Sequence, residues 1–218
     1  TGGYSAWTFA RLAEIARGRN PVEVGMDSKF GGASFGNGAP MRIAPIGLVY
    51  SEIENDPARM RKIVKEAIGF THTHEEAIDA SNVIAISVAR LSKIVDASVM
   101  DPVEFVRGLI GVCSNDEMKI RLQKISTKLT EGGFERKSEF LEKDIFREED
   151  KSFLQGNCWT PEKWFQIRAV DAVASVIFMV AKYGGLGWPK ELQESCAEIC
   201  LVRTIALGGD TDTQASIV

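Results

Sequence analysis

Apolar residues in this chain recur mostly at the spacing of a helix, and the strict alternation that is typical of strands is almost absent. The clearest case is the segment 81–95, where Ile84, Val88, Leu91 and Val95 follow one another at intervals of four, three and four residues. Side chains at these intervals share one face of a helix. We expect that face to lie in the core.

Two further helices are predicted by the residues that begin them. Asp56-Pro57 and Asp101-Pro102 each place a capping aspartate before a proline, which is suited to the first helical position. The first helix should run to about Gly69 and the second to Val112. A shorter apolar segment, 41–50, reads as the start of a buried helix.

A charged amphipathic helix should follow, capped by Asn115 or Asp116 and ended by Gly132-Gly133. Its apolar face is predicted to consist of Ile120, Leu122, Ile125 and Leu129.

The rest of the chain also favours helices. The charged stretch 135–151 is expected to be a solvated connection. Thr160-Pro161 should open a long apolar helix through Ala181, and 189–206 should form the last helix before a polar motif. The sequence therefore predicts an all-α protein, and we see no domain boundary within 1–218.

Composition narrows the class of protein without deciding the function. With 218 residues, 44% of them hydrophobic, the chain can bury one sizeable core. A net charge of −4 argues against nucleic-acid binding, which needs a basic surface. No apolar run reaches about 18 residues and no signal-like start is visible, so we expect an intracellular protein without a membrane span.

The cysteines do not indicate a disulfide framework or a zinc site. Only two of the four lie four residues apart, and no further cysteine or histidine stands near them. We expect reduced, partly buried thiols at Cys113, Cys158, Cys196 and Cys200.

The motif Gly208-Gly209-Asp210-Thr211-Asp212-Thr213 concentrates oxygen ligands behind an apolar stretch. Paired glycines allow a tight turn, after which Asp210, Asp212 and Thr213 can direct oxygens to a common centre. Such ligands suit Mg²⁺ or a similar cation. The alternative is that Asp210 or Thr211 merely caps a helix that starts near Thr213.

A second motif, residues 31–42, holds four glycines within eight residues and reads GGASFGNGAPMR. Glycines let the backbone approach a ligand closely, and such a loop can present several amides to a phosphate. The helix expected to follow it could add its dipole. The loop is not a Walker A motif, because it lacks Gly-Lys-Ser/Thr. The alternative is a glycine-rich surface loop without a ligand.

Both histidines of the chain lie in Thr71-His72-Thr73-His74. Residues two apart do not share a helix face, so a two-histidine zinc site is not indicated. The segment could be a polar turn, or one histidine could donate a hydrogen bond to an anionic or sugar ligand.

Taken in order, these motifs resemble the ADP-ribosylglycohydrolase family, whose members are all-α enzymes with a two-magnesium site. The chain is most similar to the branch that removes ADP-ribose from serine and also degrades poly(ADP-ribose). The resemblance is strong over 34–50 and 206–213 and faint over 84–164. It implies a compact orthogonal helical domain.

The resemblance also assigns roles to individual residues. It implies that the metal ligands are Asp210, Asp212 and Thr213. It also implies that ADP-ribose contacts the glycine loop at Ser34, Phe35, Gly36 and Asn37, and that it contacts His72. Phe35 stands where the serine-directed branch usually has a tyrosine. The opening Thr1–Ala6 is similar to a segment near the distal ribose, and His74 receives no role.

Two parts of the family pattern do not match anything in the chain. The catalytic glutamate and a Thr-Asp-Asp segment, which supplies the rest of the metal shell, would lie upstream of Thr1. We therefore expect an internal fragment that lacks the first and last helices of the fold, has an unknown catalytic residue and is catalytically silent on its own.

For the intact protein, the resemblance implies hydrolysis at the distal ribose C1, with two Mg²⁺ ions and ADP-ribose or an ADP-ribosylated protein as partner. We expect a monomer. Alternatives are a non-catalytic ADP-ribose-binding or crystallin-like structural member of the family, and a hydrolase of ADP-ribosyl-arginine.

Overall fold

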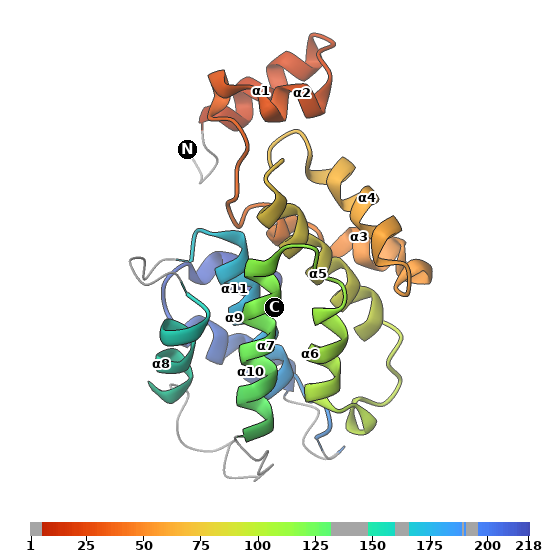
Figure 1. Cartoon of the computed structure of the whole chain (residues 1–218), viewed down its shortest axis with the longest axis vertical. Coiled ribbons are helices and arrows are strands. Elements are labelled where there is room, and N and C mark those ends of the chain that lie inside the picture. Colours follow the sequence, from red (N-terminus) through yellow and green to blue (C-terminus); the bar gives the residue numbers. More distant parts are fainter. Residues whose placement is uncertain (1–5, 132–147, 160–165, 189, 191–195) are drawn as a thin grey trace.

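A computed structural model describes residues 6–131, 148–159, 166–188, 190 and 196–218. Within these ranges the chain is all-α, as predicted, and its one β-type contact is an isolated bridge between Gly36 and Arg168. Figure 1 shows the arrangement of the helices, which are α1 (Ala6–Ala16), α2 (Pro21–Met26), α3 (Ala44–Val49), α4 (Pro57–Ile68), α5 (Glu75–Leu91), α6 (Pro102–Ile110), α7 (Asp116–Glu131), α8 (Glu148–Asn157), α9 (Ala169–Tyr183), α10 (Cys196–Ala206) and α11 (Thr211–Ile217).

Helices α5 and α9 are buried on nearly all sides and form the centre of the core. Helix α5 packs against α3, α4 and α9, and α9 also contacts α6, α7, α10 and α11. A helix that is apolar all round is typical of such a position. The prediction that only one face of the helix over 81–95 lies in the core therefore underestimates how much of α5 is buried. The predicted end was also wrong, because α5 stops at Leu91 and Val95 is fully exposed.

The helix starts predicted from Asp56, Asp101 and Asn115 are confirmed. Asp56 accepts a hydrogen bond from the amide of Arg59 before α4, and Asp101 accepts from Val103 and Glu104 before α6. Asn115 accepts from Glu117 and Met118 at the start of α7. Ile120 was assigned to the apolar face of α7 but is exposed.

The prediction of a solvated connection over 135–151 was wrong at its end. Residues from Glu148 onward form the first turn of α8, and Asp150 is buried. Its carboxylate accepts hydrogen bonds from Lys182 Nζ and Tyr183 Oη of α9. The remainder of the stretch, and the glycines expected to end α7, lie outside the described residues.

The helix predicted from Thr160 through Ala181 does not run unbroken over that range, because α9 begins only at Ala169. Residues 166–168 precede α9 without being helical, because the backbone here forms hydrogen bonds with the glycine loop instead. Residues 160–165 lie outside the described part of the chain. The helix predicted over 189–206 is described from Cys196 to Ala206 as α10, and residues 189 and 191–195 lie outside the described part.

The segment 41–50 is not the buried helix that its apolar residues predicted. A 3₁₀ turn, Pro40–Arg42, leads into the short α3, and its end exposes Leu48, Val49 and Tyr50. Helices α1 and α2 lie together at one end of the molecule (Figure 1), where Trp7, Phe9 and Met26 are also exposed.

The four cysteines form no disulfide, as expected, and all of them are buried rather than partly buried. Burial raises the pKa of Cys113, Cys158 and Cys200 to about 12. These thiols therefore stay protonated at neutral pH and are poor nucleophiles. None of the helices in the described residues is long and apolar enough to cross a bilayer.

Candidate functional site

The glycine loop is attached to the segment that precedes α9. The amide of Ala169 donates to the carbonyl of Phe35 at 2.9 Å, and the amide of Asn37 donates to the carbonyl of Ile167 at 2.8 Å. These two bonds form the isolated bridge around Gly36 and Arg168. They fix the position of the loop relative to the central helix α9.

Several loop amides are consequently engaged inside the protein. Besides Asn37, the amide of Gly36 donates to Ser34 Oγ at 3.2 Å, and those of Gly31 and Gly32 donate to carbonyls of Ser28 and Asp27. A phosphate cradle made by these particular amides, as the glycine pattern suggested, is not available in this arrangement. An anion at this loop needs other donors.

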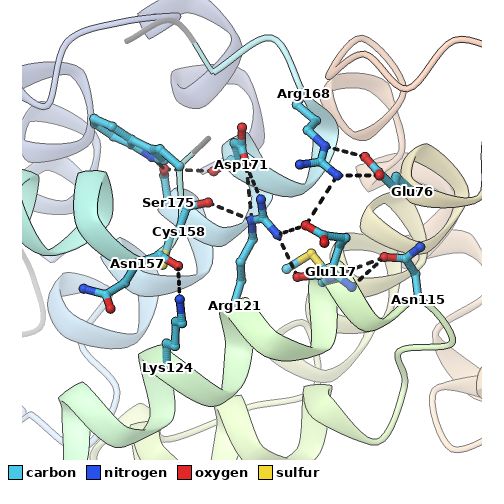
Figure 2. A network of polar contacts seen from close by, with 12 residues as sticks. Glu76, Asn115, Glu117, Arg121, Lys124, Asn157, Cys158, Arg168, Asp171 and Ser175 are labelled. Atoms are coloured by element: carbon cyan, nitrogen blue, oxygen red, sulfur yellow. Dashed lines mark hydrogen bonds and ion pairs between the residues drawn. The ribbon is translucent and has the colours of Figure 1, made fainter. Parts of the chain in front are cut away.

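A polar network holds the segment 166–168 from its other side (Figure 2). Arg168 forms two hydrogen bonds with the carboxylate of Glu76 on α5, at 2.6 and 2.5 Å, and a longer ion pair with Glu117 on α7. Below it, the buried Arg121 of α7 bonds Asp171 of α9 at 2.8 Å. Bidentate arginine–carboxylate pairs fix geometry as well as charge, so the support of the loop is rigid.

The acidic motif begins with two glycines in the left-handed region, Gly208 at φ +77° and Gly209 at φ +83°. Asp210 then occupies the N-cap position of α11, but its side chain makes no capping hydrogen bond. Instead, its Oδ2 accepts a hydrogen bond from Asn37 Nδ2 at 2.5 Å. The alternative in which the Asp210 carboxylate serves as a helix cap was therefore wrong, and the carboxylate faces the glycine loop.

Gln166 connects these two motifs, and sequence reasoning missed it. Its fully buried side-chain Oε1 accepts from the amide of Asp210 at 3.1 Å and from Gln214 Nε2 at 2.9 Å, while its carbonyl accepts from Asn37 Nδ2 at 2.6 Å. A Cβ at Gly209 would lie 2.2 Å from that Oε1, so glycine is required there by Gln166 as well as by φ. No sequence signal distinguished Gln166 from the helix predicted around it.

The two aspartates of the motif lie in different environments. Burial raises the pKa of Asp210, and the neighbouring Asp212 carboxyl raises it further. The same contact lowers the pKa of the exposed Asp212. Thr213 is buried beside them and donates its hydroxyl to Met41 Sδ at 3.3 Å.

This donor set fits a hard divalent cation, because two adjacent carboxylates and a hydroxyl supply oxygens of the kind that Mg²⁺ binds. It forms only part of a shell. Within the described ranges, no three acidic, histidine or cysteine side chains are grouped so that they could hold a metal ion by themselves.

His72 lies against the glycine loop. Its Nε2 is 3.6 Å from the point where a Cβ would stand on Gly36 and 3.5 Å from the corresponding point on Gly38. Its Nδ1 is 2.8 Å from Thr71 Oγ1. Burial lowers the pKa of His72 to about 3, and the charges of Arg42 and Arg11 act in the same direction. The imidazole is therefore neutral at physiological pH.

The other predicted ligand contacts lie at the rim. Phe35 is 47% exposed, and its ring meets that of His74 edge to face with centroids 5.8 Å apart. His74, which the resemblance left without a role, caps α5 by accepting the amide of Glu76 at its Nδ1. Ser34 supports the loop through Gly36. Residues 1–5, expected near a distal ribose, lie outside the described chain.

The structure thus brings the three predicted segments together: Asn37 contacts Asp210, and His72 lies over Gly36. A search among curated proteins finds no match. A family model described as ADP-ribosylglycohydrolase matches residues 2–218, nearly the whole chain. The glycosidase-type hydrolases of that family act on ADP-ribose linkages, and their fold is all-α, like that of the residues described here. The chain belongs to the ADP-ribosylglycohydrolase family.

Proposed function

We propose that this protein binds ADP-ribose at the glycine loop and takes part in removing ADP-ribose from modified protein side chains, with serine as the linkage and poly(ADP-ribose) as a further substrate. The observation that carries the proposal is the 2.5 Å hydrogen bond between Asn37 and Asp210, residues that are remote in sequence. It joins the ligand-binding loop to the carboxylates in one place. A helix cap and a glycine-rich surface loop, taken separately, give no reason for such a contact.

Mg²⁺ is the cofactor in this proposal, with two ions in the complete site. Asp210, Asp212 and Thr213 are the residues that would hold it, because their oxygens share the first turn of α11. Bound Mg²⁺ supplies Lewis-acid stabilisation and orients ribose hydroxyls. Asn37 keeps the Asp210 carboxylate turned toward the loop through its amide hydrogen.

The remaining residues of the site bind and orient. Phe35 offers an exposed ring for the flat parts of the ligand. His72 provides a ring nitrogen over Gly36 and Gly38. The partners that follow from this arrangement are ADP-ribose or an ADP-ribosylated protein.

Calorimetry tests the binding step and its metal dependence. The protein is titrated with ADP-ribose in Mg²⁺ and again in EDTA, with AMP as a control ligand that lacks the distal ribose. We expect measurable affinity in Mg²⁺ and a loss of at least about tenfold in EDTA, the scale on which disturbed metal sites lose function. Equal affinity in both buffers contradicts the metal assignment, and no binding in either contradicts the proposal.

The linkage is tested separately, by release of ADP-ribose from serine-modified and arginine-modified peptides by the full-length protein in the presence of Mg²⁺. Release from the serine peptide supports the proposal, and release from the arginine peptide alone supports the arginine-directed alternative. Binding of ADP-ribose without release from either peptide supports a non-catalytic member of the family.

A further inference from the structure

We propose that Arg42, Thr71 and His72 form a hydrogen-bond relay in which Arg42 is the positioning residue and His72 is held as a neutral imidazole with its proton on Nε2. The relay depends on contacts within the protein alone. Its meaning for the ligand rests on the proposed function, and the experiment below separates the two.

The relay begins at the 3₁₀ turn that follows the glycine loop. Arg42 donates through Nη1 to the carbonyl of Gly38 at 2.8 Å and through Nη2 to Thr71 Oγ1. The two arms of one guanidinium therefore connect the loop to the segment that carries His72. A lysine has a single ammonium on a flexible stem and cannot hold both acceptors in this fork geometry.

The position of the proton follows from counting donors at Thr71. A hydroxyl has one proton and two acceptor lone pairs, and one lone pair of Thr71 Oγ1 receives Arg42. Its proton has two acceptors within reach, the carbonyl of Ile68 at 3.2 Å and Nδ1 of His72 at 2.8 Å. These two acceptors are not equivalent.

The carbonyl of Ile68 already accepts two amides, from Thr71 at 3.0 Å and from His72 at 2.9 Å. It is also far for a hydroxyl donor, since O–H···O bonds usually span about 2.5–3.0 Å. Nδ1 is at good distance, so the Thr71 hydroxyl donates to it. A neutral imidazole that accepts at Nδ1 carries its proton on Nε2. The low pKa of His72 agrees with a neutral ring.

The relay determines what His72 can offer to a ligand. Nε2 lies over Gly36 and Gly38, and within the described ranges no hydrogen-bond partner reaches it. As an N–H it donates, so the ligand atom above the two glycines is an acceptor. Arg11 adds positive charge nearby through its bonds to the carbonyls of Thr71 and Gly32. The ligand group of this chemistry is an anionic oxygen, such as a pyrophosphate oxygen of ADP-ribose.

His74 provides an internal reference for the measurement. The chain has two histidines, and Nδ1 of His74 accepts the amide of Glu76 at 3.2 Å. When neutral, His74 must therefore also carry its proton on Nε2. The two rings reach the same tautomer through different partners, a hydroxyl for His72 and a backbone amide for His74.

The experiment is ¹⁵N NMR of the histidine rings in the 218-residue chain at neutral pH. A His74→Asn variant, which keeps a good capping residue, assigns the remaining signals to His72. We expect an N–H-type signal at Nε2 and an acceptor-type signal at Nδ1. Thr71→Ser, which keeps the hydroxyl, should preserve this pattern, and Thr71→Val should replace it by signals averaged between the tautomers. A proton on Nδ1 of His72, or an imidazolium at pH 6, overturns the proposal.

Arg42→Lys tests the positioning role, with Arg59→Lys on the exposed surface of α4 as the matched control. We expect averaged His72 signals and about tenfold weaker ADP-ribose binding for Arg42→Lys, with unchanged circular dichroism, and no change for Arg59→Lys. A fixed Nε2–H pattern in both Arg42→Lys and Thr71→Val overturns the relay. If the NMR signals confirm the relay but the protein binds neither ADP-ribose nor pyrophosphate, the assigned tautomer of His72 is still correct. The proposed function and the proposed ligand chemistry are then contradicted.

Discussion

Polar residues at the helix starts of this protein fall into two groups that the sequence alone does not separate. Asp56, Asp101 and His74 use their side chains to cap the helices that follow them. Asp210 occupies the same position before α11, yet its carboxylate turns away from the helix and accepts the amide hydrogen of Asn37. The same position before a helix therefore does not determine which group the side chain contacts.

The turn before α11 is held by contacts that do not involve the Asp210 carboxylate. The side chain of Gln166 accepts the amide of Asp210, and Gly208-Gly209 shape the turn. Two residues before the cap of α5, His72 likewise faces the glycine loop while His74 holds the helix.

Gly209→Ala should be the most damaging single change to the acidic turn. Its Cβ would lie 2.2 Å from Gln166 Oε1, and φ is +83°. We expect the free energy of unfolding to fall by about 3 kcal/mol, the upper end for a strained backbone position. Urea unfolding measures it, with Gly156→Ala on the exposed face of α8 as control, because nothing lies within 4 Å of that Cβ position. Equal effects at the two glycines would contradict a special role for the Gln166 contact.

Asp212→Ala should remove metal-dependent binding without unfolding the protein. The residue is exposed, so its truncation leaves no cavity in the core. We expect about a 100-fold loss of ADP-ribose affinity in Mg²⁺, as for a disturbed metal site, and an unchanged melting temperature. Calorimetry and thermal unfolding are compared for the same preparation. A lower melting temperature with unchanged affinity would place Asp212 among the structural aspartates.

The free energy of unfolding should depend on pH through His72. Its pKa is about 3 in the folded protein and near 6.5 when unfolded. The unfolded state therefore binds more protons between these values, so stability falls as the pH falls through this window. From pH 7 to pH 5 the expected loss from this group is about 2 kcal/mol. The measurement is the difference between the parent and His72→Asn, and parallel pH profiles for the two would show that His72 is not buried as a neutral ring.

The smallest expected effects concern the caps themselves. Asp101→Ala should lower the free energy of unfolding by about 1 kcal/mol through loss of a cap. Asp210→Asn should instead raise it in EDTA, by about 0.5–1 kcal/mol, because a group whose pKa is raised by burial and by Asp212 destabilises the fold when ionised. Its Oδ1 can still accept from Asn37. Destabilisation of similar size by both changes would mean that Asp210 is an ordinary structural residue.

The parts of the fold that the sequence predicted are those decided locally. The starts of α4 and α6 follow from an aspartate and a proline in adjacent positions, and a proline needs no distant partner to favour a first turn. The continuous helix predicted from Thr160 through Ala181 was wrong over 166–168, because these residues bond the glycine loop, far away in sequence. The role of Gln166 was missed for the same reason, because its contacts with Asn37 and Asp210 join segments that are far apart in sequence.

The site shows the same division. Asp210, Asn37 and His72 could be proposed because their neighbours form a family pattern, and the structure places them together. The engagement of the Gly36 and Asn37 amides could not be anticipated, since it is set by the bridge to α9. The capping role of His74 was equally invisible, because histidine is not among the residues usually expected at a cap.

The contacts of Asn37 also order the assembly of the site in time. Its side chain reaches Gln166 and Asp210, which follow it by 129 and 173 residues. During synthesis at about 5–20 residues per second, the glycine loop emerges on the order of ten seconds before these partners exist. Contacts between such distant segments also require loop closure before they form, which slows folding. The contacts that join the glycine loop to Gln166 and Asp210 therefore form only after most of the chain has been made.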